Sequence, residues 1–274
     1  MGLSMTNDAY HDPMTSPERY AQYEYQIAVD CIIPLLVHWG IRLDALRVLD
    51  VGCGGGGLSI ALAQQGAQCL GIDLKTELIS EAERVAASHQ VEVEFAVADV
   101  LNWKHRGRQY DLIILSEVLE HLVSLNNVEP VIASCRDLLA AGGSIYVSFP
   151  PWYSPFAGHQ AGWPQIRFVP WYHLLPNRLQ RLLAPGQALR YLTFARELNH
   201  LTIQVFEQTL ARLRLTIRRR ELYHIRPEFR WRYRLPVVKS SPLLTRLPMT
   251  AEVTTSGAYY LLANEPSTSQ NRDS

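Results

Sequence analysis

Ten residues in the first quarter of the chain read Val48-Leu49-Asp50-Val51-Gly52-Cys53-Gly54-Gly55-Gly56-Gly57. Their order predicts a buried strand that breaks into a glycine loop and then opens a helix. The next apolar strand ends on Asp73. A strand, a glycine loop and an acidic residue that ends the following strand form a mononucleotide-ribose site, in which Asp73 accepts hydrogen bonds from the ribose hydroxyls. Gly52 and Gly54 suit this loop because glycine tolerates positive φ and lets the backbone approach a ligand.

Three further landmarks follow along the chain, since the glycines alone would fit a dinucleotide site equally well. Asp99 ends an apolar strand, residues 110–115 have the pattern of another strand, and Glu117-Val118-Leu119-Glu120-His121-Leu122 follows it. With its D-x-G-x-G loop, the region 48–149 resembles the class I S-adenosylmethionine (SAM)-dependent methyltransferases in the order and spacing of these landmarks. The resemblance implies SAM as the cofactor, with Asp99 near the adenine amino group. The cofactor-binding residues predicted in this way are Asp50, Gly52, Cys53, Gly54, Asp73, Leu74, Asp99, Val100, Ser116 and Glu117.

Strands and helices alternate through residues 48–149, which predicts a parallel sheet with helices on both faces. Together with the resemblance, this gives an α/β fold with a Rossmann-like, doubly wound, seven-stranded sheet. The resemblance also implies a final antiparallel strand beside the fifth, which residues 257–263 fit. We predict a helix over residues 127–140, with Gly142-Gly143 as its stop before the fifth strand.

The chain divides into six segments by pattern. An aromatic, proline-rich insertion follows the fifth strand, and ligands of open α/β sheets lie beyond the carboxyl ends of the strands. We therefore expect this insertion to cap the acceptor pocket. The segments are a disordered tail (1–15), an N-terminal helical segment that starts with Ser16 as N-cap (16–47), the SAM-binding core (48–149), the substrate-capping insertion (150–198), the rest of the core sheet with a loop insertion (199–264) and a second disordered tail (265–274).

Composition limits the class of protein. The chain has 274 residues, and 47% of them are hydrophobic, which is ample for a core. Four cysteines without CxxC spacing, all in apolar contexts, indicate buried thiols in a reducing cytoplasm. No stretch has the length of a membrane span, and the N-terminus lacks a signal pattern, so we expect a cytoplasmic protein.

The zero net charge conceals an asymmetry. Residues 1–150 hold 9 Lys and Arg against 19 Asp and Glu, whereas residues 151–274 hold 17 against 7. Many of the arginines lie in residues 212–234. They suit an anionic substrate or surface, because arginine makes bidentate contacts to carboxylates and phosphates. The alternative, which we favour, is a solvated strand face that contacts the acidic half of the same molecule.

The residues after the fourth strand are candidates for the chemistry. If a helical turn begins at Glu117, then Glu117, Glu120 and His121 share one face, and His159, after the fifth strand, reaches the same place. This set can hold a divalent cation, with Mg, Mn, Zn or Fe as the options. The E-x-x-E-H arrangement resembles that of the ubiquinone-biosynthesis O-methyltransferases, and this resemblance implies a metal that lowers the pKa of an acceptor hydroxyl.

A metal-free site is the alternative, because the same pattern occurs in class I methyltransferases that need no metal. In that case His159 is the first candidate for a general base and His121 is the second. His173, His200 and His224 are expected to have packing or surface roles.

The leading hypothesis is a SAM-dependent enzyme that methylates a hydroxyl of a small-molecule acceptor. A second hypothesis is methylation of nucleic acid or protein through the arginine-rich segment, but the neutral charge and the scarcity of lysine weigh against nucleic acid. A third is a SAM-binding protein without catalysis. The acceptor, the oligomeric state and the choice among O-, N- and C-methylation stay open.

Overall fold

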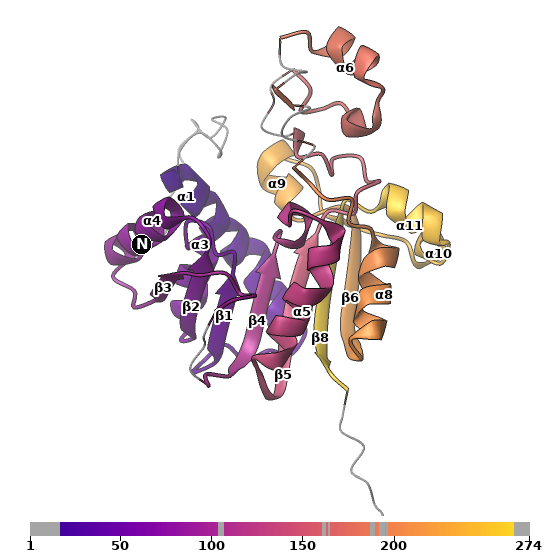
Figure 1. Ribbon diagram of the computed structural model, residues 1–274. Helices are drawn as coiled ribbons and strands as arrows, with labels where there is room; N and C mark the ends of the chain where they lie inside the picture. The colour runs from indigo at the N-terminus through magenta and orange to yellow at the C-terminus, as the bar shows by residue number, and fades with distance from the viewer. Residues whose placement is uncertain are drawn as a thin grey trace, which may run out of the picture.

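The computed structural model describes residues 17–103, 107–160, 163, 165–186, 190–191, 195 and 197–265. These residues form one eight-stranded sheet with helices on both of its faces (Figure 1). The predicted N-cap Ser16 and the predicted tails lie outside the described residues, except for Glu265.

The strand order of the sheet is β3-β2-β1-β4-β5-β8-β6-β7. Strands β1 to β5 are parallel, and β8 runs antiparallel between β5 and β6, as expected for the last strand. The strands are β1 (Arg47–Val51), β2 (Gln68–Asp73), β3 (Glu94–Val97), β4 (Tyr110–Ser116), β5 (Leu139–Phe149), β6 (Leu215–Ile225), β7 (Val238–Lys239) and β8 (Gly257–Asn264).

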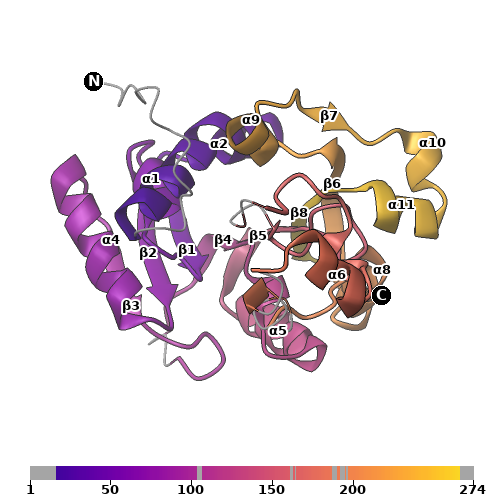
Figure 2. The ribbon, with the colours of Figure 1, turned by 90° about the horizontal axis from the view of Figure 1, so that it is seen from above.

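The two faces of the sheet are covered by different helices, as the view from above shows (Figure 2). Alternate residues of a strand point to opposite faces. Accordingly, Leu49 packs in the core under α5 and α8, whereas Val48 packs in the core under α2 and α3. The helices are α1 (Pro17–Ile27), α2 (Ile33–His38), α3 (Gly57–Ala63), α4 (Thr76–His89), α5 (Val128–Asp137), α6 (Asn177–Leu183), α8 (Ile203–Arg212), α9 (Glu228–Tyr233), α10 (Pro242–Thr245) and α11 (Pro248–Thr254).

The N-terminal helix lies directly against the glycine loop. A π-helical turn, Ala28–Ile32, joins α1 to α2, so the expected helix is present with one irregular turn. At Gly57, the first residue of α3, an added Cβ would overlap the carbonyl oxygen of Ala21 and the backbone nitrogen of Tyr25. Glycine at this position is therefore what allows α1 to pack so closely on the start of α3.

The prediction of seven strands is wrong by one. Strand β6 runs to Ile225, and its last residues pair with the two-residue edge strand β7 through Tyr223 and Lys239. The loop insertion predicted within residues 199–264 contains β7 and three short helices. A strand as short as β7 has no periodicity that could mark it in the sequence.

The boundary between α5 and β5 also differs from the prediction. Helix α5 ends at Asp137 and β5 already begins at Leu139, so Gly142-Gly143 lies within the strand and does not stop the helix. The pairing of β4 with β5 is irregular between Tyr110 and Leu112, and Gly142 has a φ of +79°. The two glycines therefore belong to a bulge, where glycine is also common.

The insertion after β5 lies beyond the carboxyl ends of the strands (Figure 1). Its described residues have a small core of their own, which includes Ile166, Tyr172 and Tyr191. The insertion also packs on α9, where the rings of Phe156 and Phe229 are 5.4 Å apart. None of the described helices is long and apolar enough to cross a membrane.

We predict that Gly57→Ala destabilises the fold by about 1–3 kcal/mol, because the added methyl overpacks the contact between α1 and α3. Gly186→Ala is the matched control, since no heavy atom lies within 4 Å of its added Cβ. Urea denaturation of both variants measures the difference. Equal stability of the two variants would contradict the tight contact.

Candidate functional site

A cavity of about 320 Å³ lies at the carboxyl ends of β1 and β4. These two strands are neighbours in the middle of the sheet, where ligands of doubly wound folds bind. Four parts of the chain supply its walls. They are α1 with Tyr20, Tyr23 and Glu24, the end of β1 and the loop after it with Asp50, Gly52 and Cys53, the end of β4 and the turn after it with Ser116, Glu117 and His121, and later segments with His159, Trp163, Arg226 and Glu228.

A hydrogen bond to Asp73 holds the glycine loop at the end of β2. The N–H of Gly54 donates to Oδ2 of Asp73 at 3.2 Å, and the N–H of Lys75 donates to Oδ1 of the same side chain at 2.9 Å. Gly54 has a φ of +55°, and an added Cβ there would overlap the carboxylate of Glu24. The loop therefore needs glycine both for its backbone conformation and for the close approach of α1.

Two carboxyl groups other than Asp73 lie at this loop. Asp50 is buried, accepts a hydrogen bond from the Ser59 hydroxyl at 2.6 Å, and has its pKa raised by burial to about 6. Glu24 accepts the N–H of Gly55 at 3.1 Å, and burial together with the charge of Asp50 raises its pKa well above the ordinary value. Glu24 was not predicted as a site residue, because nothing in the pattern of α1 distinguishes it from a surface residue.

The remaining predicted cofactor residues lie at the ends of β2 and β3. Leu74 is exposed, and Val100 is partly buried. Asp99 accepts the N–H of Leu101 at 3.0 Å and the side-chain amide of Asn102 at 2.8 Å. These residues and Asp73 lie at the carboxyl-end edge of the sheet, outside the walls of the cavity, and their role in cofactor binding stays a prediction.

A buried arginine, Arg226, forms part of the cavity wall. Arg226 Nη1 is 2.6 Å from Glu117 Oε2, and its Nε is 3.8 Å from Glu228 Oε2. The hydroxyl of Tyr259 donates to Glu228. Burial alone would lower the pKa of Arg226. The neighbouring carboxylates have the larger effect and hold this pKa above its ordinary value. From the sequence, Arg226 was predicted only as a member of the arginine-rich segment, and Glu228 was not predicted as a site residue.

Glu120, His121 and His159 come together beside this pair. One ligand atom from each residue lies within 4.8 Å of the others, and His159 Nε2 is 3.7 Å from Glu120 Oε1. Both carboxylate oxygens of Glu120 are buried and accept no hydrogen bond from the described residues. Burial and the charge of Glu117 raise the pKa of Glu120 well above its ordinary value.

Of the four residues predicted as metal ligands, Glu120, His121 and His159 form one group, and Glu117 is not part of it. Glu117 has a φ of +56° and is held by Arg226, so the helical turn begins at Leu119 and not at Glu117. The expected common face of Glu117, Glu120 and His121 does not form. Desolvation and the charge of Lys75 lower the pKa of His121, although the residue as a whole is exposed.

The other histidines have structural contacts. His200 stacks on Trp152 at 4.1 Å between ring centroids, and the ring of His173 lies 2.8 Å from the Trp152 carbonyl oxygen. His224 lies 2.8 Å from the carbonyl oxygen of Thr254. These contacts agree with the packing roles expected for the three residues.

Several arginines of residues 212–234 pair within the molecule. Arg212 pairs with Glu129 and Arg220 pairs with Glu207, each at 2.7 Å. The pair with Glu129 supports the interpretation that the basic segment contacts the acidic half of the molecule, whereas Glu207 lies in the basic half itself.

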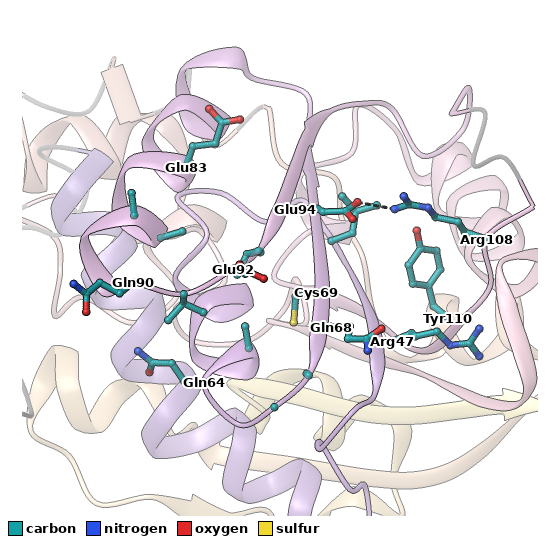
Figure 3. A pocket seen from close by; sticks show the side chains of 18 of the residues that line it. Arg47, Gln64, Gln68, Cys69, Glu83, Gln90, Glu92, Glu94, Arg108 and Tyr110 are labelled. Carbon is teal, nitrogen blue, oxygen red and sulfur yellow. Dashed lines mark hydrogen bonds and ion pairs between the residues drawn. The ribbon is translucent and has the colours of Figure 1, made fainter.

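A larger hollow of about 1220 Å³ lies elsewhere, near the amino ends of β1 and β2 (Figure 3). Arg47 and Gln68, which start these strands, lie at its rim with polar side chains such as Gln64 and Gln90. Its Arg108 pairs with Glu94 at 2.6 Å. None of its described lining residues is a predicted site residue, so the smaller cavity is the candidate site.

Comparison with known proteins agrees with this geometry. Residues 48–143 match the family model described as a methyltransferase domain. A ubiquinone biosynthesis O-methyltransferase of Leptothrix cholodnii is 39% identical over 125 residues, which cover 43% of this chain and 51% of that protein. The same enzyme of Burkholderia thailandensis is 36% identical over 120 residues, which cover 42% of this chain and 50% of that protein. The chain thus spans about half the length of the curated relatives it matches.

Solved structures share the fold. The magnesium protoporphyrin IX methyltransferase of Synechocystis, solved with bound S-adenosylhomocysteine (SAH), superposes with a TM-score of 0.56 at 19% identity and covers 96% of this chain and 90% of that one. The PH0226 protein of Pyrococcus horikoshii gives a TM-score of 0.58 at 16% identity and covers 96% of this chain and 100% of that one. The predicted resemblance to the class I SAM-dependent methyltransferases is confirmed, and the fold is theirs.

We predict that Arg226→Gln destabilises the protein by about 3–5 kcal/mol, because it leaves carboxylates without their buried partner. Arg212→Gln is the control, since its exposed pair with Glu129 should contribute only about 0–1 kcal/mol. Chemical denaturation of both variants tests the difference. If Arg226→Gln cost no more than Arg212→Gln, the ion pair would not hold the cavity wall together.

Proposed function

We propose that this protein is a SAM-dependent methyltransferase that transfers a methyl group to a hydroxyl oxygen of a small molecule. The position of Asp73 carries the proposal. Its carboxylate is fixed beside the glycine loop by the N–H groups of Gly54 and Lys75. Each carboxylate oxygen has two acceptor sites, so both oxygens keep one for a ribose hydroxyl. The matched family model and the names of the curated relatives support the same activity.

The carboxyl groups of the cavity suit a positively charged cofactor. Glu24, Asp50, Glu117 and Glu228 line it, against one arginine. Burial raises the pKa of Glu24 and Asp50, and a cation bound beside them would favour their charged forms. SAM supplies a methyl group on a positively charged sulfur, and thus brings its own leaving group. The chain has to bind the cofactor, orient the acceptor and exclude water, and positioning alone supplies much of the rate of such a displacement. We assign Asp99 to the adenine end and Ser116 with Glu117 to the end that faces the acceptor.

The two histidines of the cavity are the candidates for the base that removes the proton of the acceptor hydroxyl. His121 and His159 have their ring centroids 4.9 Å apart at the wall of the cavity. Because the pKa of His121 is lowered, its ring is neutral near pH 7 and can accept a proton. We assign His159 as the first candidate base, since it comes from the insertion over the strand ends, and His121 as the second.

A divalent metal is the alternative use of the same residues. Buried Glu120, with two carboxylate oxygens that accept no hydrogen bond from the described residues, fits a cation, and the two imidazoles complete a set that admits Zn, Fe or Mn. A metal there would lower the pKa of an acceptor hydroxyl. We assign Glu120, His121 and His159 as the ligands and leave out Glu117, because Arg226 already binds its carboxylate.

The insertion supplies His159 and Trp163 to the cavity. We propose that it closes the acceptor side, as its place beyond β5 suggests. Methylation of nucleic acid is less well supported, because two of the arginines that would bind phosphate pair with Glu129 and Glu207. Release of SAH on addition of a phenolic acceptor would distinguish the proposed enzyme from a SAM-binding protein without catalysis.

We predict that Asp73→Asn weakens SAM binding by roughly 10- to 150-fold, because a hydrogen bond to a charged group contributes about 1.5–3 kcal/mol. Asp137→Asn, on the surface at the end of α5, is the control and should bind normally. Calorimetric titration with SAM measures both. Unchanged affinity in Asp73→Asn would refute the ribose assignment.

We predict that Glu120→Gln lowers affinity for Mn²⁺ or Zn²⁺ at least roughly tenfold, whereas Glu117→Gln retains it. Affinity should also fall as the pH falls, because protons compete for Glu120, whose pKa is raised. Elemental analysis of protein purified without chelator, followed by metal titration at several pH values, provides the measurement. Absence of any bound metal would leave the histidines as bases, and equal losses in both variants would return Glu117 to the ligand set.

A further inference from the structure

We propose that Asn199 is a positioning residue of the candidate site, whose side chain holds the turn after β4 so that Glu120 and His121 meet His159. This inference deepens the proposed function and rests on its assignment of these three side chains. Asn199 is buried and does not line the cavity, so it acts through the turn and not on a ligand.

Asn199 supplies hydrogen bonds that the turn itself lacks. Residues Leu119–His121 form one turn of 3-10 helix, and the carbonyl groups at the end of a helix have no partners within it. The side-chain amide of Asn199 donates to the carbonyl oxygens of Leu119 at 2.6 Å and Leu122 at 3.1 Å, and its backbone N–H donates to that of Glu120 at 2.9 Å. Within the turn, the N–H of Leu122 is 3.4 Å from the carbonyl oxygen of Leu119, which is a long hydrogen bond. The peptide groups around Glu120 and His121 therefore depend on Asn199 for their orientation.

Asn199 is itself held in place by the start of α8. It lies just before Thr202, the N-cap of this helix, whose side chain accepts a hydrogen bond from the first turn. The carboxylate of Glu252, in α11, accepts the N–H groups of Ile203 at 3.1 Å and Gln204 at 2.8 Å. These contacts fix the beginning of α8, so the segment before it is a rigid support for the turn.

The same segment also holds the beginning of the insertion. The rings of His200 and Trp152 are stacked with their centroids 4.1 Å apart, and the N–H of Trp152 donates to the carbonyl oxygen of Leu201 at 2.8 Å. Trp152 lies at the start of the insertion that carries His159. Asn199 and its two neighbours therefore connect the insertion to the turn after β4.

The close spacing of the three side chains makes this connection important. One ligand atom from each of Glu120, His121 and His159 lies within 4.8 Å of the others. The first two come from the turn and the third comes from the insertion. A functional site of this kind needs its side chains held to within about 0.5 Å by the contacts behind them. Because Asn199 joins the two elements that supply them, its hydrogen bonds set the separation of the three side chains.

Titration of the full chain with Co²⁺ tests the proposal. The ion probes whether the three side chains lie together, and its visible absorption reports its coordination. We expect Asn199→Ala to weaken Co²⁺ binding at least roughly tenfold and to leave the affinity for SAM within about twofold of the unchanged protein. Asn199→Ser, which keeps one donor, should lose less Co²⁺ affinity, and it replaces Asn199→Ala if that variant does not fold. Calorimetry with SAM and a thermal melt accompany each titration.

Gln180→Ala is the matched control. Gln180 is also a buried amide side chain, and it donates to the carbonyl oxygens of Tyr172 and Leu175, each at 2.9 Å. It belongs to α6, which Figure 1 shows well away from the sheet. Its loss should lower the melting temperature, as Asn199→Ala does, but should retain Co²⁺ affinity, because a general loss of stability does not move the turn.

Three outcomes would overturn the inference: equal Co²⁺ affinity of Asn199→Ala and the unchanged protein, equal losses in Asn199→Ala and Gln180→Ala, or no Co²⁺ binding by the unchanged protein. Failure of the unchanged protein to bind SAM would instead contradict the proposed function. In that case the Co²⁺ titration would still decide whether Asn199 positions the turn.

Discussion

The ion pair between Arg226 and Glu117 joins two parts of the chain that are 109 residues apart. Glu117 follows β4 in the core sheet, and Arg226 follows β6 in the last third of the sequence. Glu228 and Tyr259 continue the network into α9 and β8. A buried guanidinium is stable only with its carboxylates in place, so the wall of the cavity and the C-terminal strands have to form together.

The same ion pair determines which carboxylate beside the histidines is not bound by an arginine. Because Arg226 holds Glu117, Glu120 is left with buried oxygens beside the two histidines. Glu117 and His159 both adopt positive φ, which costs non-glycine residues on the order of 1–2 kcal/mol each. Such conformations persist where surrounding contacts hold them, and they gather at functional sites. Both strained residues are neighbours of Glu120, since His159 Nε2 is 3.7 Å from its carboxylate and the charge of Glu117 raises its pKa.

Local patterns were enough to predict the core of the fold. The strand and glycine loop at residues 48–57 and the acidic end of β2 are where the patterns indicated, and the antiparallel last strand is where the family resemblance implied it. The misses share a physical cause, since each depends on contacts between distant segments. Strand β7 exists because β6 has an unpaired end, and the bulge at Gly142 depends on the pairing of β5 with β4. Glu24 and Arg226 gain their roles only when α1 and β6 are folded against the loop.

The packing of α1 on the glycine loop has a kinetic consequence. Ala21 lies against Gly55 and Gly57, and the Glu24 carboxylate binds the Gly55 N–H, so the helix covers the place where the proposed cofactor would bind. A cofactor seated at this loop would compete with the Glu24 carboxylate for the Gly55 N–H, so its exchange would depend on how firmly α1 is held there. Residence time would be governed by how tightly the first helix is packed, and not only by contacts to the ligand.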